Sequence, residues 1–219
     1  MSADIELART NMVENQVRTW DVLDLRVLDV LGRVRREDFV PLRYRAMAFA
    51  DLSLPIGHDE VMMKPVVEGR LLQAVEPQPH EHVLEIGTGS GFVTACLAAL
   101  AGQVVSVEQH ADLSDAAATR LGAAGVRNVR LAVADAMRGY EPDGSFDAVV
   151  VTGAVYTIPD RFRAWVKPGG RLFAIVGESP AMQAVLLTRL DGDRWHEESL
   201  FETDVPYLTH AAPPRRFTL

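Results

Sequence analysis

From residue 79 onward, short apolar runs alternate with helical stretches, and this alternation restricts the fold more than any other feature. Strand–helix alternation at this spacing implies right-handed crossovers and therefore parallel strands. Residues 146–152 are almost unbroken in apolar side chains, which is typical of a strand covered on both faces. The sequence thus predicts an α/β protein with a doubly wound, mostly parallel sheet. The expected strands are residues 82–86, 103–108, 129–134, 146–152 and 171–176, and the expected helices are residues 90–101, 111–123 and 158–166.

The C-terminal part has a different pattern. Residues 183–190 and 194–200 flank the turn Asp191-Gly192-Asp193, which is a strong signal for an antiparallel hairpin. We therefore expect the sheet to finish with an antiparallel edge at its C-terminal end.

The N-terminal part is expected to be helical. Residues 7–18 and 24–34 have apolar side chains at helical spacing. Residues 53–64 are expected to form an ordered loop, because proline and glycine residues there prevent a continuous helix. We predict that residues 1–78 form a helical segment and this loop, packed on an α/β domain of residues 79–219 as one compact unit.

Composition excludes several classes of protein. The 219 residues include 22 Lys and Arg against 30 Asp and Glu, and the formal net charge of −8 argues against general nucleic-acid binding. The single cysteine, Cys96, excludes an internal disulfide framework and a cysteine-based zinc site, and no metal site is expected. No stretch approaches the roughly 18 apolar residues of a membrane helix, and the first residues lack the apolar region of a secretory signal. We therefore expect a cytoplasmic protein that binds neither nucleic acid nor membranes.

A glycine-rich turn joins the first expected strand to the helix that follows it. Its glycines are Gly87, Gly89 and Gly91, in the pattern G-x-G-x-G. The dinucleotide fingerprint G-x-G-x-x-G would need its third glycine at position 92, where Phe92 stands. The acidic Glu85 precedes the turn, and a carboxylate there would repel a pyrophosphate but would suit a cationic ammonium group.

Two further acids end the next strands. Glu108 is well placed to accept hydrogen bonds from ribose hydroxyls, and Asp135 could meet an adenine amino group. Adenosine with an ammonium-bearing tail describes S-adenosylmethionine better than NAD. A dinucleotide remains the alternative ligand, and glycines that serve packing alone remain the structural alternative. Thr152, which ends a later strand, is expected to line the same cleft.

Several other segments match the sequence motifs of a known protein family. They include Arg36-Glu37-Asp38-Phe39-Val40-Pro41, Leu54-Pro55-Ile56-Gly57-His58 and Lys167-Pro168-Gly169-Gly170-Arg171-Leu172. With the glycine-rich turn, they resemble the protein-L-isoaspartate O-methyltransferase family over residues 12–208. The resemblance implies a Rossmann-like methyltransferase fold preceded by N-terminal helices. It also implies methyl transfer from S-adenosylmethionine to the carboxylate of isoaspartyl residues in damaged proteins, with S-adenosylhomocysteine as the product.

The resemblance also assigns site residues. In the loop before the first strand it points to His58, Met63 and Lys64 as candidate acceptor-loop residues. The expected cofactor-binding residues are Glu85, Gly87, Thr88, Gly89, Ser90, Gly91, Glu108, Gln109, Asp135, Ala136 and Thr152.

This sequence departs from the family at one important position. Where the family has Thr-Ile-Ser-Gln-Pro, the chain has Val61-Met62-Met63-Lys64-Pro65, so Met63 occupies the position of the active-site serine. A thioether cannot donate a hydrogen bond to a carboxylate.

Three hypotheses therefore stay open. The first is an isoaspartyl methyltransferase in which Lys64 or a backbone N–H replaces the hydroxyl. The second is a methyltransferase of the same fold that modifies another peptide carboxylate or a small molecule. The third is a cofactor-binding protein that does not transfer methyl groups. A carboxylate acceptor is already ionised at neutral pH, so the absence of a general base does not argue against the first hypothesis.

Overall fold

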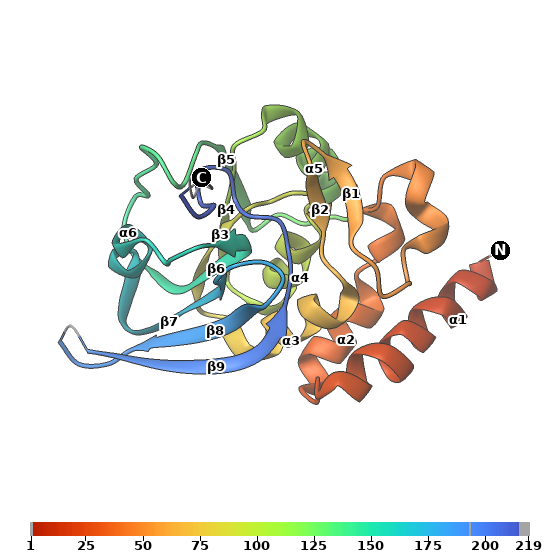
Figure 1. The fold of residues 1–219 in the computed structure, drawn as a ribbon. Coiled ribbons are helices and arrows are strands. Elements are labelled where there is room, and N and C mark those ends of the chain that lie inside the picture. Colours follow the sequence, from red (N-terminus) through yellow and green to blue (C-terminus); the bar gives the residue numbers. More distant parts are fainter. Residues whose placement is uncertain (1, 193, 215–219) are drawn as a thin grey trace, which may run out of the picture.

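The computed structural model describes residues 2–192 and 194–214, and its centre is a twisted seven-stranded sheet (Figure 1). The strand order is β5-β4-β3-β6-β7-β8-β9. The first five strands in this order are parallel, and the β7–β8 and β8–β9 pairs are antiparallel. The predicted fold class is therefore confirmed. The strands are β3 (His82–Ile86), β4 (Gln103–Glu108), β5 (Val129–Val133), β6 (Phe146–Val155), β7 (Val166–Val176), β8 (Met182–Arg189) and β9 (Trp195–Thr203).

Helices cover both faces of the sheet. α3 (Pro65–Val75) and α4 (Phe92–Leu100) share one hydrophobic cluster with alternate strand residues such as Val83 and Phe173. α6 (Asp160–Ala164) belongs to a second cluster with Leu84 and its neighbours, on the other face. This division follows from the two-residue period of a strand, which sends successive side chains to opposite faces. α5 (Ala111–Ala123) packs beside β4 and β5.

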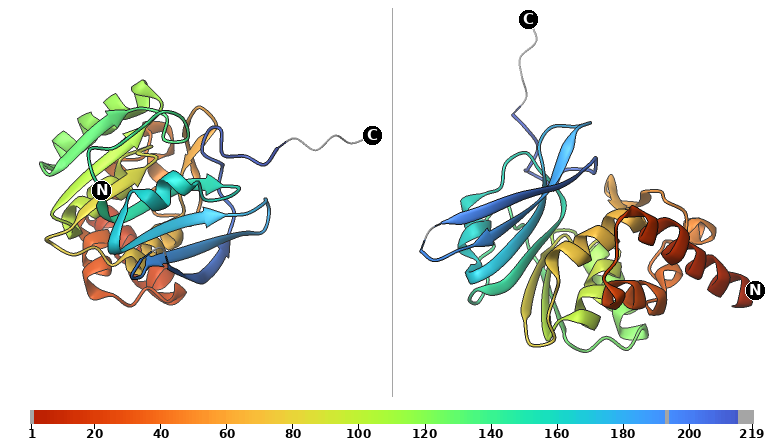
Figure 2. Two further views of the ribbon diagram at one scale, coloured as in Figure 1. Left: turned by 90° about the vertical axis from the view of Figure 1, so that its left-hand side faces the viewer. Right: turned by 90° about the horizontal axis from the view of Figure 1, so that it is seen from below.

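The N-terminal segment consists of short helices on the α3–α4 side. The right-hand view of Figure 2 shows them beside the sheet and far from β8 and β9. The Asp24 carboxylate caps α2 by accepting a hydrogen bond from the Arg26 N–H at 2.8 Å. The helix expected at residues 7–18 is divided, because a π-helical turn and a 3₁₀ turn follow the first α-helix. These elements are α1 (Ser2–Met12), η1 (Val13–Val17), η2 (Arg18–Trp20), α2 (Leu25–Arg33), η3 (Arg36–Asp38) and η4 (Leu42–Met47).

The expected loop at residues 53–64 contains a β-hairpin. β1 (Leu54–Gly57) pairs with β2 (Glu60–Met62), and Leu54 stands opposite Met62. His58 and Asp59 form the turn with φ angles of 54° and 61°. Two successive left-handed residues match the twist of a tight hairpin, and aspartate tolerates that conformation better than most side chains. The loop prediction was thus wrong for the seven residues of the two strands.

The guanidinium of Arg36 connects this hairpin to the helices. Its Nε donates to the Ala48 carbonyl at 2.8 Å, its Nη2 donates to the Met63 carbonyl at 2.7 Å, and its Nη1 is paired with Glu68 of α3. The central carbon of the guanidinium, Cζ, also lies 4.9 Å from the centre of the Phe92 ring at the start of α4. The side chains of both charged partners are almost completely buried. One cation thus holds the end of the hairpin, α3 and α4 together.

The hydrophobic cluster on this face continues across the predicted boundary at residue 78. It includes Leu31 and Leu72 from the N-terminal segment and Val83 and Phe173 from the sheet. The division into residues 1–78 and 79–219 remains a prediction. None of the helices in the described part of the chain is long and apolar enough to span a membrane.

The buried ion pair generates a stability prediction. We expect Glu68→Ala to lower the free energy of unfolding by about 3–5 kcal/mol, because it leaves the Arg36 charge buried without its partner. Urea denaturation measures this change. Asp29→Ala is the matched control, since Asp29 pairs with Arg33 on an exposed helix face and its loss should cost less than about 1 kcal/mol. Equal effects of the two substitutions would contradict the assigned role of Arg36.

Candidate active site

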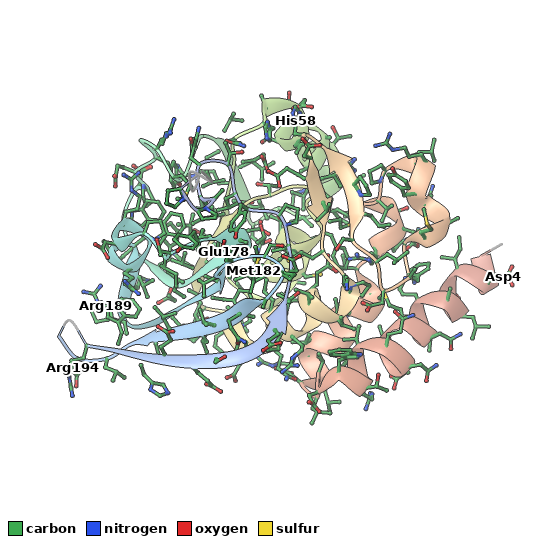
Figure 3. All side chains as sticks on the ribbon, in the orientation of Figure 1. Asp4, His58, Glu178, Met182, Arg189 and Arg194 are labelled. Carbon is green, nitrogen blue, oxygen red and sulfur yellow. The ribbon has the colours of Figure 1, made fainter. Side chains whose placement is uncertain are left out.

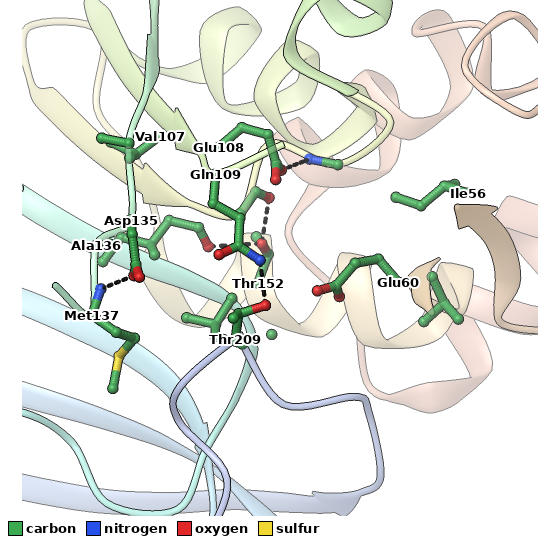
Figure 4. Close-up of a pocket in the computed structure, with 17 residues that line it drawn as sticks. Ile56, Glu60, Val107, Glu108, Gln109, Asp135, Ala136, Met137, Thr152 and Thr209 are labelled. Carbon is green, nitrogen blue, oxygen red and sulfur yellow. Dashed lines mark hydrogen bonds between the residues drawn. The ribbon is translucent and has the colours of Figure 1, made fainter. Parts of the chain in front are cut away.

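A cavity lies at the carboxyl ends of β3, β4 and β6, with the β1–β2 hairpin on its other side (Figure 4). Parallel strands place their carboxyl ends at one edge of the sheet, and ligands of open α/β sheets bind there. Seven of the cofactor residues expected from the sequence line this cavity. They are Gly87, Gly89, Glu108, Gln109, Asp135, Ala136 and Thr152.

The glycine-rich turn passes close to its neighbours on both sides. Gly87 has a φ of +98°, and a Cβ there would collide with the Thr152 hydroxyl. That hydroxyl donates to the carbonyls of Ile86 and Gly87, at 2.9 and 2.5 Å. Gly89 has a φ of +51°, and a Cβ there would approach Ile56 of the hairpin to 3.0 Å. Only glycine therefore fits at these two positions without strain.

The carboxylate of Glu108 is fixed at the end of β4. One oxygen accepts a hydrogen bond from the Gly89 N–H at 2.9 Å, and the other accepts one from the His110 N–H at 3.0 Å. A carboxylate has about four lone-pair positions, so Glu108 can accept further hydrogen bonds from a ligand in the cavity. The acid thus holds the glycine-rich turn and also faces the cavity.

Asp135 has a similar arrangement after β5. One of its oxygens accepts from the Met137 N–H at 2.8 Å, and the other lies 2.7 Å from Nδ1 of His210. Its carboxylate also retains capacity to accept a hydrogen bond from a ligand.

Glu85 lies beneath the turn and does not line the cavity. Its carboxyl is buried and accepts hydrogen bonds from Thr94 of α4 at 2.5 Å and from Ser106 of β4 at 2.6 Å. The Thr88 hydroxyl is 2.5 Å from that of Ser106 and extends this network to the turn. Burial raises the pKa of Glu85 to about 8, while the two hydroxyl hydrogen bonds lower it. Glu85 therefore supports the turn from beneath. The structure does not bring its carboxyl to the cavity, where the contact with an ammonium group was expected.

Thr88, Ser90 and Gly91 also lie outside the cavity lining. Thr88 and Ser90 are buried, and Gly91 has a φ of +86° at the N-cap of α4. These three residues shape the transition from the turn to the helix.

None of the three candidate acceptor-loop residues lines the cavity. Met63 is 4% exposed, and its side chain belongs to the hydrophobic core. Lys64 is exposed and serves as the N-cap residue of α3. His58 lies at the tip of the hairpin (Figure 3), where its Nε2 is 2.9 Å from Asp112 and its ring stacks on His110 at 3.9 Å. Hydrogen bonding to Asp112 raises the pKa of His58 and fastens the hairpin to α5.

The sequence analysis missed the residues that complete the cavity walls. The hairpin contributes Ile56, Glu60 and Val61, and the C-terminal segment contributes Leu208 and Thr209. The C-terminal segment is held against β6, because the Ala154 N–H donates to the Pro206 carbonyl and the Leu208 N–H donates to the Ala154 carbonyl. Alternation along the hairpin was the available signal for its three residues. The remaining lining residues are Ile86, Val107, Ala134, Met137 and Gly153.

Within residues 2–192 and 194–214, no group of three or more histidine, cysteine, aspartate or glutamate side chains could hold a metal ion.

The fold and the cavity together define a methyltransferase of the Rossmann-like class, and the comparisons narrow this class to one family. The family model for protein-L-isoaspartate(D-aspartate) O-methyltransferase matches residues 8–209. A protein-L-isoaspartate O-methyltransferase of Methanoculleus marisnigri is 39% identical over 184 residues, covering 84% of each chain. One from Brucella anthropi is 34% identical and covers 90% of this chain and 91% of its own. The chain belongs to the protein-L-isoaspartate O-methyltransferase family.

Solved structures agree with this fold. A Plasmodium falciparum structure of the same family name, in complex with S-adenosyl-L-homocysteine, matches with a TM-score of 0.78 at 18% identity and covers 91% of this chain and 97% of its own. A second structure named protein-L-isoaspartate O-methyltransferase matches with a TM-score of 0.76 at 22% identity and covers 91% of this chain and 65% of its own.

The buried Glu85 generates a pH prediction. Because its pKa is raised from 4.5 to about 8 in the folded protein, the folded state holds a proton that the unfolded state has lost. Between about pH 5 and pH 8, stability therefore falls as pH rises, by about 1.4 kcal/mol per pH unit from this group. We expect Glu85→Gln to remove that part of the slope, as measured by urea denaturation across the range.

Glu197→Gln is the matched control, because Glu197 is exposed on β9. It should leave the slope unchanged. A Glu85→Gln variant with the same slope as the wild type would show that Glu85 is ionised in the folded protein.

Proposed function

We propose that this chain transfers the methyl group of S-adenosylmethionine to the free carboxylate of isoaspartyl residues in proteins. The observation that carries the proposal is the cavity at the strand ends, where the glycine-rich turn, Glu108 and Asp135 meet in a chain that matches this family over most of its length. The product would be an isoaspartyl methyl ester together with S-adenosylhomocysteine. A protein substrate and a cytoplasmic location belong to the same proposal.

The lining residues fit the proposed cofactor. The Glu108 carboxylate can accept hydrogen bonds from the ribose hydroxyls, and the Asp135 carboxylate can accept one from the adenine amino group. Val107, Ala136 and Met137 supply apolar surface beside these acids for the adenine ring. Gly87 and Gly89 line the cavity without side chains, so the amino-acid end can approach the backbone of the turn there. When bound, the cofactor supplies an electrophilic methyl group on a sulfonium.

The protein's own contribution would be positioning and the exclusion of water. An isoaspartyl carboxylate is an anion at neutral pH and attacks the methyl carbon without a general base. Holding it in line with the methyl–sulfur bond supplies the main rate advantage. Ile56 and Val61 supply apolar surface on the hairpin side of the cavity, which would help to keep water away from the methyl group.

One observation favours a second candidate, a methyltransferase of the same fold with another acceptor. The Met63 side chain lies in the core and Lys64 is outside the cavity lining, so neither replaces the serine hydroxyl of the family. An isoaspartyl acceptor would then depend on backbone N–H groups or on other lining residues.

The direct test is methyl transfer from labelled S-adenosylmethionine to an isoaspartyl peptide, with the matched aspartyl peptide as control. We expect label in the isoaspartyl peptide alone, released by mild base as expected for a methyl ester. Binding of S-adenosylhomocysteine without transfer to either peptide would contradict the isoaspartyl proposal and favour another acceptor.

Met63→Ser serves as a variant arm of the same assay. The sequence comparison alone predicts a faster reaction once the hydroxyl is restored. Because the Met63 side chain is buried in the core, we expect instead a loss of about 2–4 kcal/mol in stability and no gain in rate. A clear gain in rate would show that position 63 reaches the acceptor.

A further inference from the structure

Glu60 stands out among the polar side chains of the cavity. It projects from β2 into the cavity, from the hairpin side (Figure 4). The five other hydrogen-bonding side chains of the lining each have a partner, whereas within the described residues the Glu60 carboxyl has no hydrogen bond or ion pair. Those five are Glu108, Gln109, Asp135, Thr152 and Thr209.

Among the described residues, none supplies a counter-charge that outweighs the burial of the Glu60 carboxyl. Burial raises its pKa to about 7, the Glu108 carboxylate of β4 adds to this effect, and His58 opposes it. Asp59 of the same hairpin adds a further negative charge. His58 and Asp135 are already engaged, since His58 is paired with Asp112 of α5 and Asp135 is paired with His210 of the C-terminal segment. A cation that enters the cavity would therefore find Glu60 available.

The methyl donor and the product that a methyltransferase binds differ by one positive charge. S-adenosylmethionine and S-adenosylhomocysteine share the adenosine, the ammonium and the carboxylate, and they differ by one methyl group and the positive charge of the sulfonium. We propose that the Glu60 carboxylate distinguishes S-adenosylmethionine from S-adenosylhomocysteine by pairing with the sulfonium charge, which only the methyl donor carries. Glu60 thus acts as a specificity-determining residue for the cofactor.

This arrangement links the methylation state of the ligand to a proton. A sulfonium beside Glu60 favours the ionised carboxyl, so binding of the methyl donor at neutral pH releases a fraction of a proton. Methyl transfer removes the positive charge, and Glu60 then regains its proton beside a neutral thioether. The preference for donor over product should consequently increase with pH, because only an ionised Glu60 attracts the sulfonium.

The test is the ratio of the dissociation constants of S-adenosylhomocysteine and S-adenosylmethionine, measured by calorimetry at pH 6 and pH 8. The sulfonium also lowers the pKa of the donor's own ammonium group, so the pH dependence that belongs to the ligands themselves is taken from the ratio in Glu60→Gln. If the sulfonium lowers the pKa of Glu60 by about one unit, the wild-type ratio should rise about fivefold between the two pH values relative to the ratio in Glu60→Gln.

Asp59→Asn is the matched control. It removes a carboxylate from the same turn that does not line the cavity, and asparagine tolerates the left-handed backbone there. Its ratio should rise with pH as in the wild type. The same pH dependence of the ratio in the wild type and in Glu60→Gln would overturn the inference.

A second measurement remains decisive if Glu60→Gln does not fold. Titrating the wild type at pH 7 in two buffers of different ionisation enthalpy should show proton release with S-adenosylmethionine and none with S-adenosylhomocysteine. Equal proton release with both ligands would overturn the role of Glu60.

The inference rests on the cofactor of the proposed function and is independent of the methyl acceptor. Absence of binding by both ligands would refute the cofactor, whereas binding of both with the same pH dependence in the wild type and in Glu60→Gln would refute Glu60 alone. Failure of isoaspartyl methylation would leave both binding results unaffected.

Discussion

The guanidinium of Arg36 is fully buried, and the position of the site depends on how its charge is satisfied. Each of its three nitrogens donates a hydrogen bond, to Ala48, to Met63 and to Glu68 of α3. A buried charge is tolerated only when it is paired and hydrogen-bonded. The requirement therefore fixes the backbone at the end of β2 and sets α3 against α4. The hairpin that forms one wall of the cavity is attached to the protein through this group at its base and through His58 at its tip.

Three glutamates around the glycine-rich turn have separate roles because their surroundings differ. Glu85 is buried under the turn, with a raised pKa, and connects β3, β4 and α4. Glu108 holds the turn from the cavity side through the Gly89 N–H. Glu60 faces the same space from the hairpin and makes no such bond within the described residues. Glu85 supports the structure, Glu108 can hold a neutral polar part of a ligand, and Glu60 can respond to the charge of the ligand.

Much of this architecture was predictable from local pattern. β3, β4 and α5 have the same bounds as the expected segments, because strands covered on both faces and helices closed by glycine leave clear signals. β7 begins five residues before its expected start, since the Lys-Pro-Gly-Gly segment resembles a loop in sequence but pairs irregularly with β6. The sequence also predicted the acids at the ends of β4 and β5.

The remaining part of the site depends on contacts between distant segments. Ile56, Glu60, Leu208 and Thr209 reach the cavity only because the hairpin and the C-terminal segment fold over the strand ends. The Met63 side chain lies in the core, and its carbonyl accepts a hydrogen bond from Arg36, 27 residues away in sequence. For Glu85 the local signal existed, since strand alternation places it on the same face as Val83, towards α4. Family resemblance alone could not show that orientation.

The central claim is that the cavity at the ends of β3, β4 and β6 is the cofactor site, with the β1–β2 hairpin as its cover. A crystal structure of the protein with S-adenosylhomocysteine tests this most directly. We expect ribose hydroxyls within hydrogen-bond distance of Glu108, adenine beside Asp135 and Ala136, and the thioether sulfur on the side of Glu60. A ligand bound elsewhere, or bound without contact to Glu108, would contradict it.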